Sequence, residues 1–313
     1  MLKEILFEDV CFNCLRIVRG DIVERKVSFY SAGLKLSGLV RVPEDYSKDE
    51  KRAAIVLCHG FTGIKEWLIP PYAEAFTKAG YVTFTFDYRG FGESEGIRGR
   101  LIPMEQSEDI RNAITFMETL DEVDENRIGL WGTSFGGANV VYTAGVDPRP
   151  KCVVSQVGFG DGERTARAYL SEDMVSFFLE AIKQDRRKRV LTGESFYLKQ
   201  TDVLSDAESV AVFSRDVKKL PRLETMLTME YAENQMIYKP ENLVHLISPR
   251  ALLLIQAEKD SIIPLGEARN LYEKAGEPKK LVTLEGITHF QIYEGKGLEK
   301  SIQLALDWYK KYL

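Results

Sequence analysis

The chain has 313 residues, of which 44% are hydrophobic and 28% charged, and its formal net charge is −5. A chain of this length and apolar content can bury a core, so we expect one large folded domain or two modest ones rather than a disordered protein. The mild acidity argues against nucleic acid as a main partner, because phosphate binding needs a basic surface. The only histidines are His59, His245 and His289, so a metal centre built from several histidines is not expected.

The N-terminal segment has no pattern of a secretion signal. Charged side chains interrupt every apolar run there, at Lys3, Glu4, Glu8 and Asp9. No stretch elsewhere approaches the ~20 apolar residues of a membrane span, so we predict a soluble, cytoplasmic protein without a membrane partner. Cys11 and Cys14 form a C-x-x-C pair. A zinc site needs four ligands and no second pair accompanies this one, so we interpret both as ordinary thiols.

Alternating elements begin near residue 22. Residues 22–42 predict a β-hairpin that turns at Ser31-Ala32-Gly33. Beyond it, short apolar runs predict strands at 53–60, 81–87, 127–132, 151–158, 251–260 and 280–286. Helical patterns separate them near 70–79, 105–120, from about 134, and near 266–275 and 297–311. Continuous apolar strands that alternate with helices predict an α/β fold whose parallel sheet is covered on both faces.

Residues 159–245 interrupt this alternation. They contain no comparable strand, but helical patterns, a basic run at 183–189 and many methionine and aromatic residues. The segment is too long and too aromatic for a simple loop. We interpret it as a helical cap inserted into an α/β core that comprises residues 1–158 and 246–313. Most of its aromatic residues should form the core of the cap, and a minority should line a substrate pocket.

The strongest motif is Gly132-Thr133-Ser134-Phe135-Gly136-Gly137, which follows an apolar strand and begins a helix. In this context G-x-S-x-G indicates a nucleophilic serine on a tight, strained turn. The flanking positions must be small because the turn is crowded. The helix N-terminus places free N–H groups near a developing oxyanion. We therefore predict that Ser134 is the nucleophile.

A serine hydroxyl needs a base, and a histidine held by a carboxylate is the expected one. His289 follows the last predicted strand, in a loop that can reach over the strand ends, so we predict that it is the base. His245 lies near the junction of cap and core and is interpreted as a surface or junction histidine. For His59 we favour a structural role, in which the ring holds its loop through hydrogen bonds.

The acid that orients the base should end another strand. Asp260 does so, and the order of nucleophile, acid and histidine along the chain agrees with that of this serine turn. Glu258 in the same turn and Asp161 after the strand at 151–157 are the alternatives. Asp87 also ends a strand, but scaffolding its loop through Arg89 and nearby backbone groups is a simpler role.

An oxyanion hole needs two N–H groups that converge on one oxygen. One should be the amide of Phe135, directly after the nucleophile. The other should come from the loop after the first core strand, His59-Gly60-Phe61-Thr62-Gly63, and we choose the amide of Phe61.

Together these motifs make the chain resemble the α/β-hydrolase family. The resemblance covers about residues 22–158 and 246–313 and rests on HGFTG at 59–63, DYRGFGES at 87–94, GTSFGG at 132–137, AEKD at 257–260 and THF at 288–290. It implies a mostly parallel eight-stranded sheet with helices on both faces, and acyl-enzyme chemistry on Ser134.

Features of individual branches are also present. HGFTG followed by KEW resembles dienelactone hydrolases and cinnamoyl or feruloyl esterases. The long cap and the ISPRALLLIQAEKD junction resemble Xaa-Pro-peptidase-related and polyketide-processing hydrolases. Dienelactone hydrolases use a cysteine nucleophile, whereas this sequence has Ser134, which favours an esterase.

We therefore predict a serine hydrolase that cleaves carboxylic esters of small to medium acyl compounds, without a metal or organic cofactor. Trp67 and Phe159 are candidate pocket residues. The same triad could instead act on thioesters, amides, peptides or C–C bonds, or transfer acyl groups. A non-catalytic binding protein is the remaining alternative. The hairpin or the cap could support a homodimer.

Overall fold

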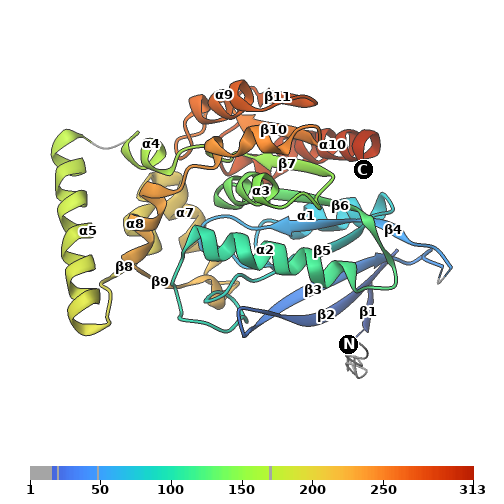
Figure 1. Ribbon diagram of the computed structural model, residues 1–313, viewed down its shortest axis with the longest axis horizontal. Coiled ribbons are helices and arrows are strands. Elements are labelled where there is room, and N and C mark those ends of the chain that lie inside the picture. Colours follow the sequence, from blue (N-terminus) through green and yellow to red (C-terminus); the bar gives the residue numbers. More distant parts are fainter. Residues whose placement is uncertain (1–15, 20, 48, 169–170) are drawn as a thin grey trace, which may run out of the picture.

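The computed structural model describes residues 16–19, 21–47, 49–168 and 171–313. Cys11 and Cys14 therefore lie outside the described residues. The central feature is a sheet whose described strands follow the order β1-β2-β3-β5-β4-β6-β7-β10-β11 (Figure 1). The predicted α/β fold with its mostly parallel eight-stranded sheet is confirmed. The four-residue strand β1 (Arg16–Arg19) adds a ninth member at the edge, antiparallel to β2.

The hairpin predicted at 22–42 forms the antiparallel part of this sheet. Its strands are β2 (Ile22–Ser31) and β3 (Leu34–Pro43), joined through Ala32 and Gly33 at φ 48° and 80°. Two residues with positive φ are what a two-residue hairpin turn needs to match the twist of its strands. β3 then pairs antiparallel with β5, which connects the hairpin to the parallel strands.

The parallel strands are buried over most of their length, except β11, which lies at the edge of the sheet and buries only Leu284. They are β4 (Arg52–Cys58), β5 (Val82–Phe86), β6 (Val123–Thr133), β7 (Cys152–Gln156), β10 (Ala251–Ala257) and β11 (Lys279–Leu284). Every residue of β5, β7 and β10 is buried. Strands covered on both faces lose the polar–apolar alternation, which explains the continuous apolar runs of the sequence.

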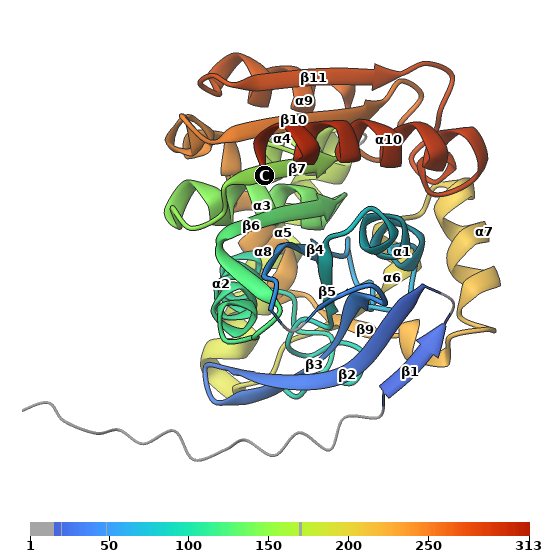
Figure 2. The ribbon, with the colours of Figure 1, turned by 90° about the vertical axis from the view of Figure 1, so that its right-hand side faces the viewer.

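Helices cover the two faces of the sheet and create two hydrophobic clusters. α1 (Pro70–Lys78) and α10 (Gly295–Tyr312) cover one face, as Figure 2 shows. The other face carries α2 (Pro103–Glu118), α3 (Phe135–Val146) and α9 (Leu265–Lys274). α1, α2, α9 and α10 each pack an apolar stripe on the sheet, whereas α3 is buried on most of its surface.

Residues 157–250 separate β7 from β10 and are called the insertion below. It contains α4 (Gly162–Arg167), α5 (Glu172–Thr192), α6 (Gln200–Val203), α7 (Ala207–Asp216) and α8 (Glu230–Ile237). It also contains the short antiparallel pair β8 (Tyr197–Lys199) and β9 (Met226–Thr228), and the 3-10 turns η1 (Pro221–Leu223), η2 (Pro240–Asn242) and η3 (Val244–Ile247). β7 pairs directly with β10, so the core is continuous across the insertion.

α5 stands apart from the sheet at one end of the molecule (Figure 1). Its ends are well defined: the Ser171 hydroxyl accepts the Met174 N–H, and Gly193 adopts φ 77° after the last turn. Within the described part of the chain, no helix has the length and apolar character needed to cross a membrane.

Candidate active site

Ser134 lies in the turn between β6 and α3. Its backbone adopts φ 55° and ψ −122°, a conformation that costs a non-glycine residue about 1–3 kcal/mol and persists only where its surroundings hold it. The Ser134 amide donates to the carbonyl of Gln156 at 2.8 Å, and its carbonyl accepts the Gly137 amide at 2.9 Å. These bonds fix the turn between β7 and the first turn of α3.

Close backbone approach explains the glycines around Ser134. A Cβ on Gly132 would lie 2.2 Å from the carbonyl oxygen of Gly136, and a Cβ on Gly136 would lie 2.3 Å from that of Cys58. A Cβ on Gly60 would approach Ser134 Cβ to 3.0 Å. The loop after β4 therefore packs directly against the serine turn, where the second oxyanion donor was expected.

His289 and Asp260 form a buried pair. His289 Nδ1 lies 2.8 Å from Asp260 Oδ2, and the two side chains are 4% and 1% exposed. Asp260 follows β10, and its other oxygen accepts the amides of Ile262 and Ile263, both at 2.8 Å. A carboxylate only accepts hydrogen bonds, so Nδ1 of the histidine donates and Nε2 remains the acceptor of the neutral ring.

A polar layer below the site fixes the loop that carries His289. The hydroxyls of Tyr293 and Thr133 are 2.6 Å apart, which ties this loop to the end of β6. Tyr72 donates its hydroxyl to the carbonyl of Ile292 at 2.7 Å and accepts from Gln156 Nε2 at 2.9 Å. The position of the histidine is thus set by two strands and α1 as well as by Asp260.

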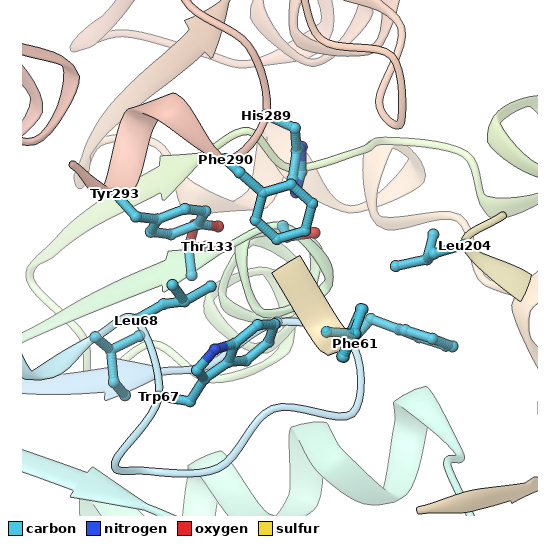
Figure 3. Close-up of a pocket in the computed structure, with 12 residues that line it drawn as sticks. Phe61, Trp67, Leu68, Thr133, Leu204, His289, Phe290 and Tyr293 are labelled. Atoms are coloured by element: carbon cyan, nitrogen blue, oxygen red, sulfur yellow. The ribbon is translucent and has the colours of Figure 1, made fainter. Parts of the chain in front are cut away.

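Ser134 and His289 open onto one mostly apolar pocket (Figure 3). Its other lining residues are Gly60, Phe61, Trp67, Leu68, Ile69, Thr133, Leu204, Phe213, Phe290 and Tyr293. The cavity volume is about 20 Å³, about enough for one water molecule. Among the residues that the structure describes, no group of three His, Cys, Asp or Glu side chains is placed to hold a metal ion.

The structure separates the two candidate pocket residues. Trp67 lines the pocket, but Phe159 is not among the described residues that do. Phe159 is 1% exposed and packs edge-on against Phe135, with 5.2 Å between ring centres, and beside Tyr238. Phe159 is thus buried between the start of α3 and the insertion, so this expectation is corrected.

The alternative residues have other partners. Glu258 accepts the Gly286 amide at 2.7 Å, and Asp161 accepts the Arg164 amide at the start of α4. His245 is exposed in η3. His59 fits its expected structural role: Nδ1 lies 3.0 Å from the Gly60 carbonyl oxygen, and burial lowers the pKa of the ring.

Asp87 scaffolds its loop, but not through Arg89. Its carboxylate accepts the Lys65 amide at 2.7 Å, Lys65 Nζ at 2.6 Å and the Glu93 amide at 2.9 Å. Arg89 instead binds Asp109. Burial opposes the charge of Lys65, yet the surrounding carboxylates, Asp87 first, raise the pKa of its ammonium above the ordinary value. Sequence reasoning missed Lys65, because a lysine between loop residues is normally interpreted as exposed.

Two polar side chains of the insertion also contact the loop after β4. Gln200 Nε2 donates to Thr62 Oγ1 at 2.7 Å, and Asp216 Oδ2 accepts the indole N–H of Trp67 at 2.9 Å. No sequence signal identifies Gln200 or Asp216, since neither lies in a motif and their partners are 138 and 149 residues away.

Comparison with known proteins agrees with the fold. The family described as serine aminopeptidase, S33, matches residues 49–296. An uncharacterised 31.7 kDa protein of Escherichia coli, from the traX–finO intergenic region, is 38% identical, with 90% of this chain and 97% of that protein covered. Quorum-quenching protein AidA of Acinetobacter baumannii is 26% identical, with 91% and 94% covered. The crystal structure of hypothetical protein PA2218 from Pseudomonas aeruginosa has a TM-score of 0.83 at 24% identity, with 94% and 95% covered.

Other similar proteins carry names for several related reactions. They include thiohydrolases and an acyltransferase among the curated sequences, and esterases among the solved structures. The α/β-hydrolase fold is common to these structures, while the named activities differ in the acyl bond concerned.

Proposed function

Because the chain belongs to the serine aminopeptidase S33 family of α/β-hydrolases, we propose that it is a serine hydrolase that cleaves carboxylic esters of small to medium acyl compounds. The observation that carries the proposal is the buried His289–Asp260 pair beside Ser134 on one apolar pocket. The apolar character of this lining suits an acyl group, and the reacting carbonyl would lie at the serine.

In the proposed reaction, Ser134 Oγ attacks the ester carbonyl carbon while His289 Nε2 takes its proton. Asp260 holds the ring in the tautomer that can accept that proton and stabilises the imidazolium. The amides of Phe61 and Phe135 receive the oxyanion. His289 then protonates the leaving alkoxide as the C–O bond breaks. A water molecule, deprotonated by His289, attacks the acyl-enzyme and releases the acid.

The pocket favours esters over aminopeptidase substrates. A free α-ammonium group needs an anionic partner when water is excluded. None of the described residues that line the pocket carries a carboxylate. The relatives named thiohydrolases make thioesters the second candidate, since the same attack on the carbonyl would serve.

A fluorophosphonate probe tests the nucleophile. We expect the folded protein to be labelled at Ser134, as located by peptide mass spectrometry, and Ser134→Ala to remain unlabelled. An unlabelled wild-type protein with an intact unfolding transition would overturn the hydrolase assignment and favour a binding protein.

A panel of substrates tests which type of acyl bond the protein cleaves. We expect kcat/KM for p-nitrophenyl esters to exceed that for aminoacyl anilides and for acyl thioesters with the same acyl group. Preferred turnover of anilides or thioesters would reject the ester assignment and retain the triad.

A further inference from the structure

The loop after β4 contains a turn with unusual backbone geometry. The Gly63 amide donates to the Gly60 carbonyl at 3.1 Å, which closes a turn over Phe61 and Thr62. Thr62 has φ 51° although it is a β-branched residue, and it is 2% exposed. The third position of a type II turn requires positive φ and is normally glycine. Something outside the turn must therefore hold Thr62 there.

Gln200 is the side chain that contacts this threonine from the insertion. Its Nε2 donates to Thr62 Oγ1 at 2.7 Å, and the residue is 5% exposed. Gln200 comes directly after β8, at the first position of α6. The contact thus joins the two-stranded sheet of the insertion to the turn that holds Phe61.

The orientation of the Gln200 amide is fixed by backbone groups of opposite polarity. Its Oε1 accepts the Thr225 amide at 3.2 Å, and its Nε2 donates to the Leu223 carbonyl at 2.8 Å. Exchanging Oε1 and Nε2 by rotating the amide would place the NH₂ group against the Thr225 N–H and the oxygen against the Leu223 carbonyl. The donor therefore faces Thr62 in a set direction.

We propose that Gln200 is a positioning residue for the oxyanion hole: its hydrogen bond holds Thr62, and with it the neighbouring Phe61 amide, in the geometry that receives the oxyanion. The inference rests on the proposed function. Gln200 itself touches no reacting atom. The Trp67–Asp216 bond gives the same loop a second anchor on the insertion, beyond the turn.

The test removes the hydrogen bond from either side while keeping side-chain volume. Gln200→Met and Thr62→Val should each lower kcat for a p-nitrophenyl ester about tenfold, less than the 10²–10³-fold loss on deleting an oxyanion donor. KM should change little, because the oxyanion exists only in the transition state. The double variant should be no slower than the worse single variant, since the Gln200–Thr62 hydrogen bond is already lost in each single variant.

A thionoester substrate separates this role from a general loss of structure. Its carbonyl carries sulfur, which accepts hydrogen bonds more weakly than oxygen, so its turnover depends less on the two amides. We expect the ratio of ester to thionoester kcat to fall in Gln200→Met and in Thr62→Val. An unchanged ratio would overturn the proposal.

Asp185 provides the matched control within the insertion. It is 1% exposed at its side chain and accepts from Ser195 Oγ and from the Phe196 amide, both at 2.7 Å. Asp185→Asn should lower the unfolding temperature and leave kcat and the substrate ratio unchanged. Equal losses of kcat in Asp185→Asn and Gln200→Met would reject a specific role for Gln200.

Failure of the role of Gln200 and failure of the proposed hydrolase function would give different results. If Gln200→Met does not fold, as judged by its unfolding transition, Thr62→Val decides the test from the other partner. If the wild-type protein is not labelled by fluorophosphonate, the proposed function itself fails. If it is labelled and turns over esters while both variants keep wild-type kcat, only the role of Gln200 is overturned.

Discussion

Asp260 binds His289 through one carboxylate oxygen and its own turn through the other. Oδ2 lies 2.8 Å from His289 Nδ1, while Oδ1 accepts the amides of Ile262 and Ile263. The two oxygens therefore have partners of different kinds. An asparagine could satisfy the amides only with its oxygen, which would turn its NH₂ group toward the histidine.

Asp260→Asn should therefore fix the wrong tautomer. Nδ1 would have to accept, the ring proton would move to Nε2, and the histidine could no longer take the Ser134 proton. We expect kcat to fall about 10⁴-fold, while the unfolding temperature changes little. Glu258→Gln, in the same turn, is the control and should keep its activity. A loss of less than about tenfold in Asp260→Asn would contradict the role of Asp260.

Backbone strain at Ser134 predicts a difference between two inactive variants. Both Ser134→Ala and Ser134→Gly should lack ester turnover. Only glycine relieves the strain of φ 55°, and after its larger unfolded-state entropy is subtracted, we expect Ser134→Gly to be more stable than Ser134→Ala by about 1 kcal/mol. Urea unfolding measures this difference, and a Ser134→Gly variant less stable than Ser134→Ala would show that the turn is unstrained.

Gly136 and Gly266 form a contrasting pair of helical glycines. Gly136→Ala would place a methyl group 2.3 Å from the Cys58 carbonyl oxygen and 2.4 Å from that of His59, and should cost about 3 kcal/mol through overpacking. A Cβ on Gly266 would have nothing within 4 Å, so Gly266→Ala should add about 0.5–1 kcal/mol. Urea midpoints that move in the same direction would contradict the close approach.

Glu93 should make the protein acid-sensitive. Burial opposes its charge, but Lys26, Lys65 and Arg222 hold the pKa of this carboxyl well below its usual range. A depressed native pKa adds stability above the unfolded value of about 4.3, and that stability is lost as the pH falls below it. The excess stability of wild type over Glu93→Gln should therefore be greatest near pH 7 and shrink below about pH 4. Urea unfolding at several pH values checks this, and a constant difference would reject it.

Leu204 should limit the length of the acyl group. It belongs to the insertion and lines the pocket together with Phe61 and Trp67 of the loop after β4 (Figure 3). Leu204→Ala opens space, so kcat/KM for hexanoyl relative to acetyl p-nitrophenyl ester should rise several-fold. Leu179→Ala on the exposed part of α5 should leave the ratio unchanged. A ratio unaffected by Leu204→Ala would place the acyl chain elsewhere.

The strands of the core could be predicted because each of them is a continuous apolar run in the local sequence. The run at 251–260 became β10, and the helical pattern near 266–275 became α9. The residues proposed for catalysis follow such strands, so their position could be inferred from chain order alone. The pattern also indicated that the segment after β7 leaves the core.

The wrong or missing predictions concern residues whose contacts depend on burial or on a partner far away in the sequence. Phe159 follows a strand, as Asp260 does, but it packs against Phe135 and Tyr238. Arg89 is near Asp87 in sequence and binds Asp109 instead. Strands β8 and β9, of three residues each, are too short to show a period. Gln200 reaches Thr62 across 138 residues, and no local pattern encodes such a pairing.

The contacts of Gln200 and Asp216 with the loop after β4 limit how freely the insertion can be exchanged. The insertion leaves the sheet after β7 and returns at the adjacent strand β10, so replacing it with the corresponding segment of a relative would need only two junctions. Such an exchange would leave the hydroxyl of Thr62 without its donor, Gln200, and the indole N–H of Trp67 without its acceptor, Asp216. A replacement segment that preserves function must therefore supply hydrogen-bond partners for Thr62 and Trp67, or these two residues must be substituted at the same time.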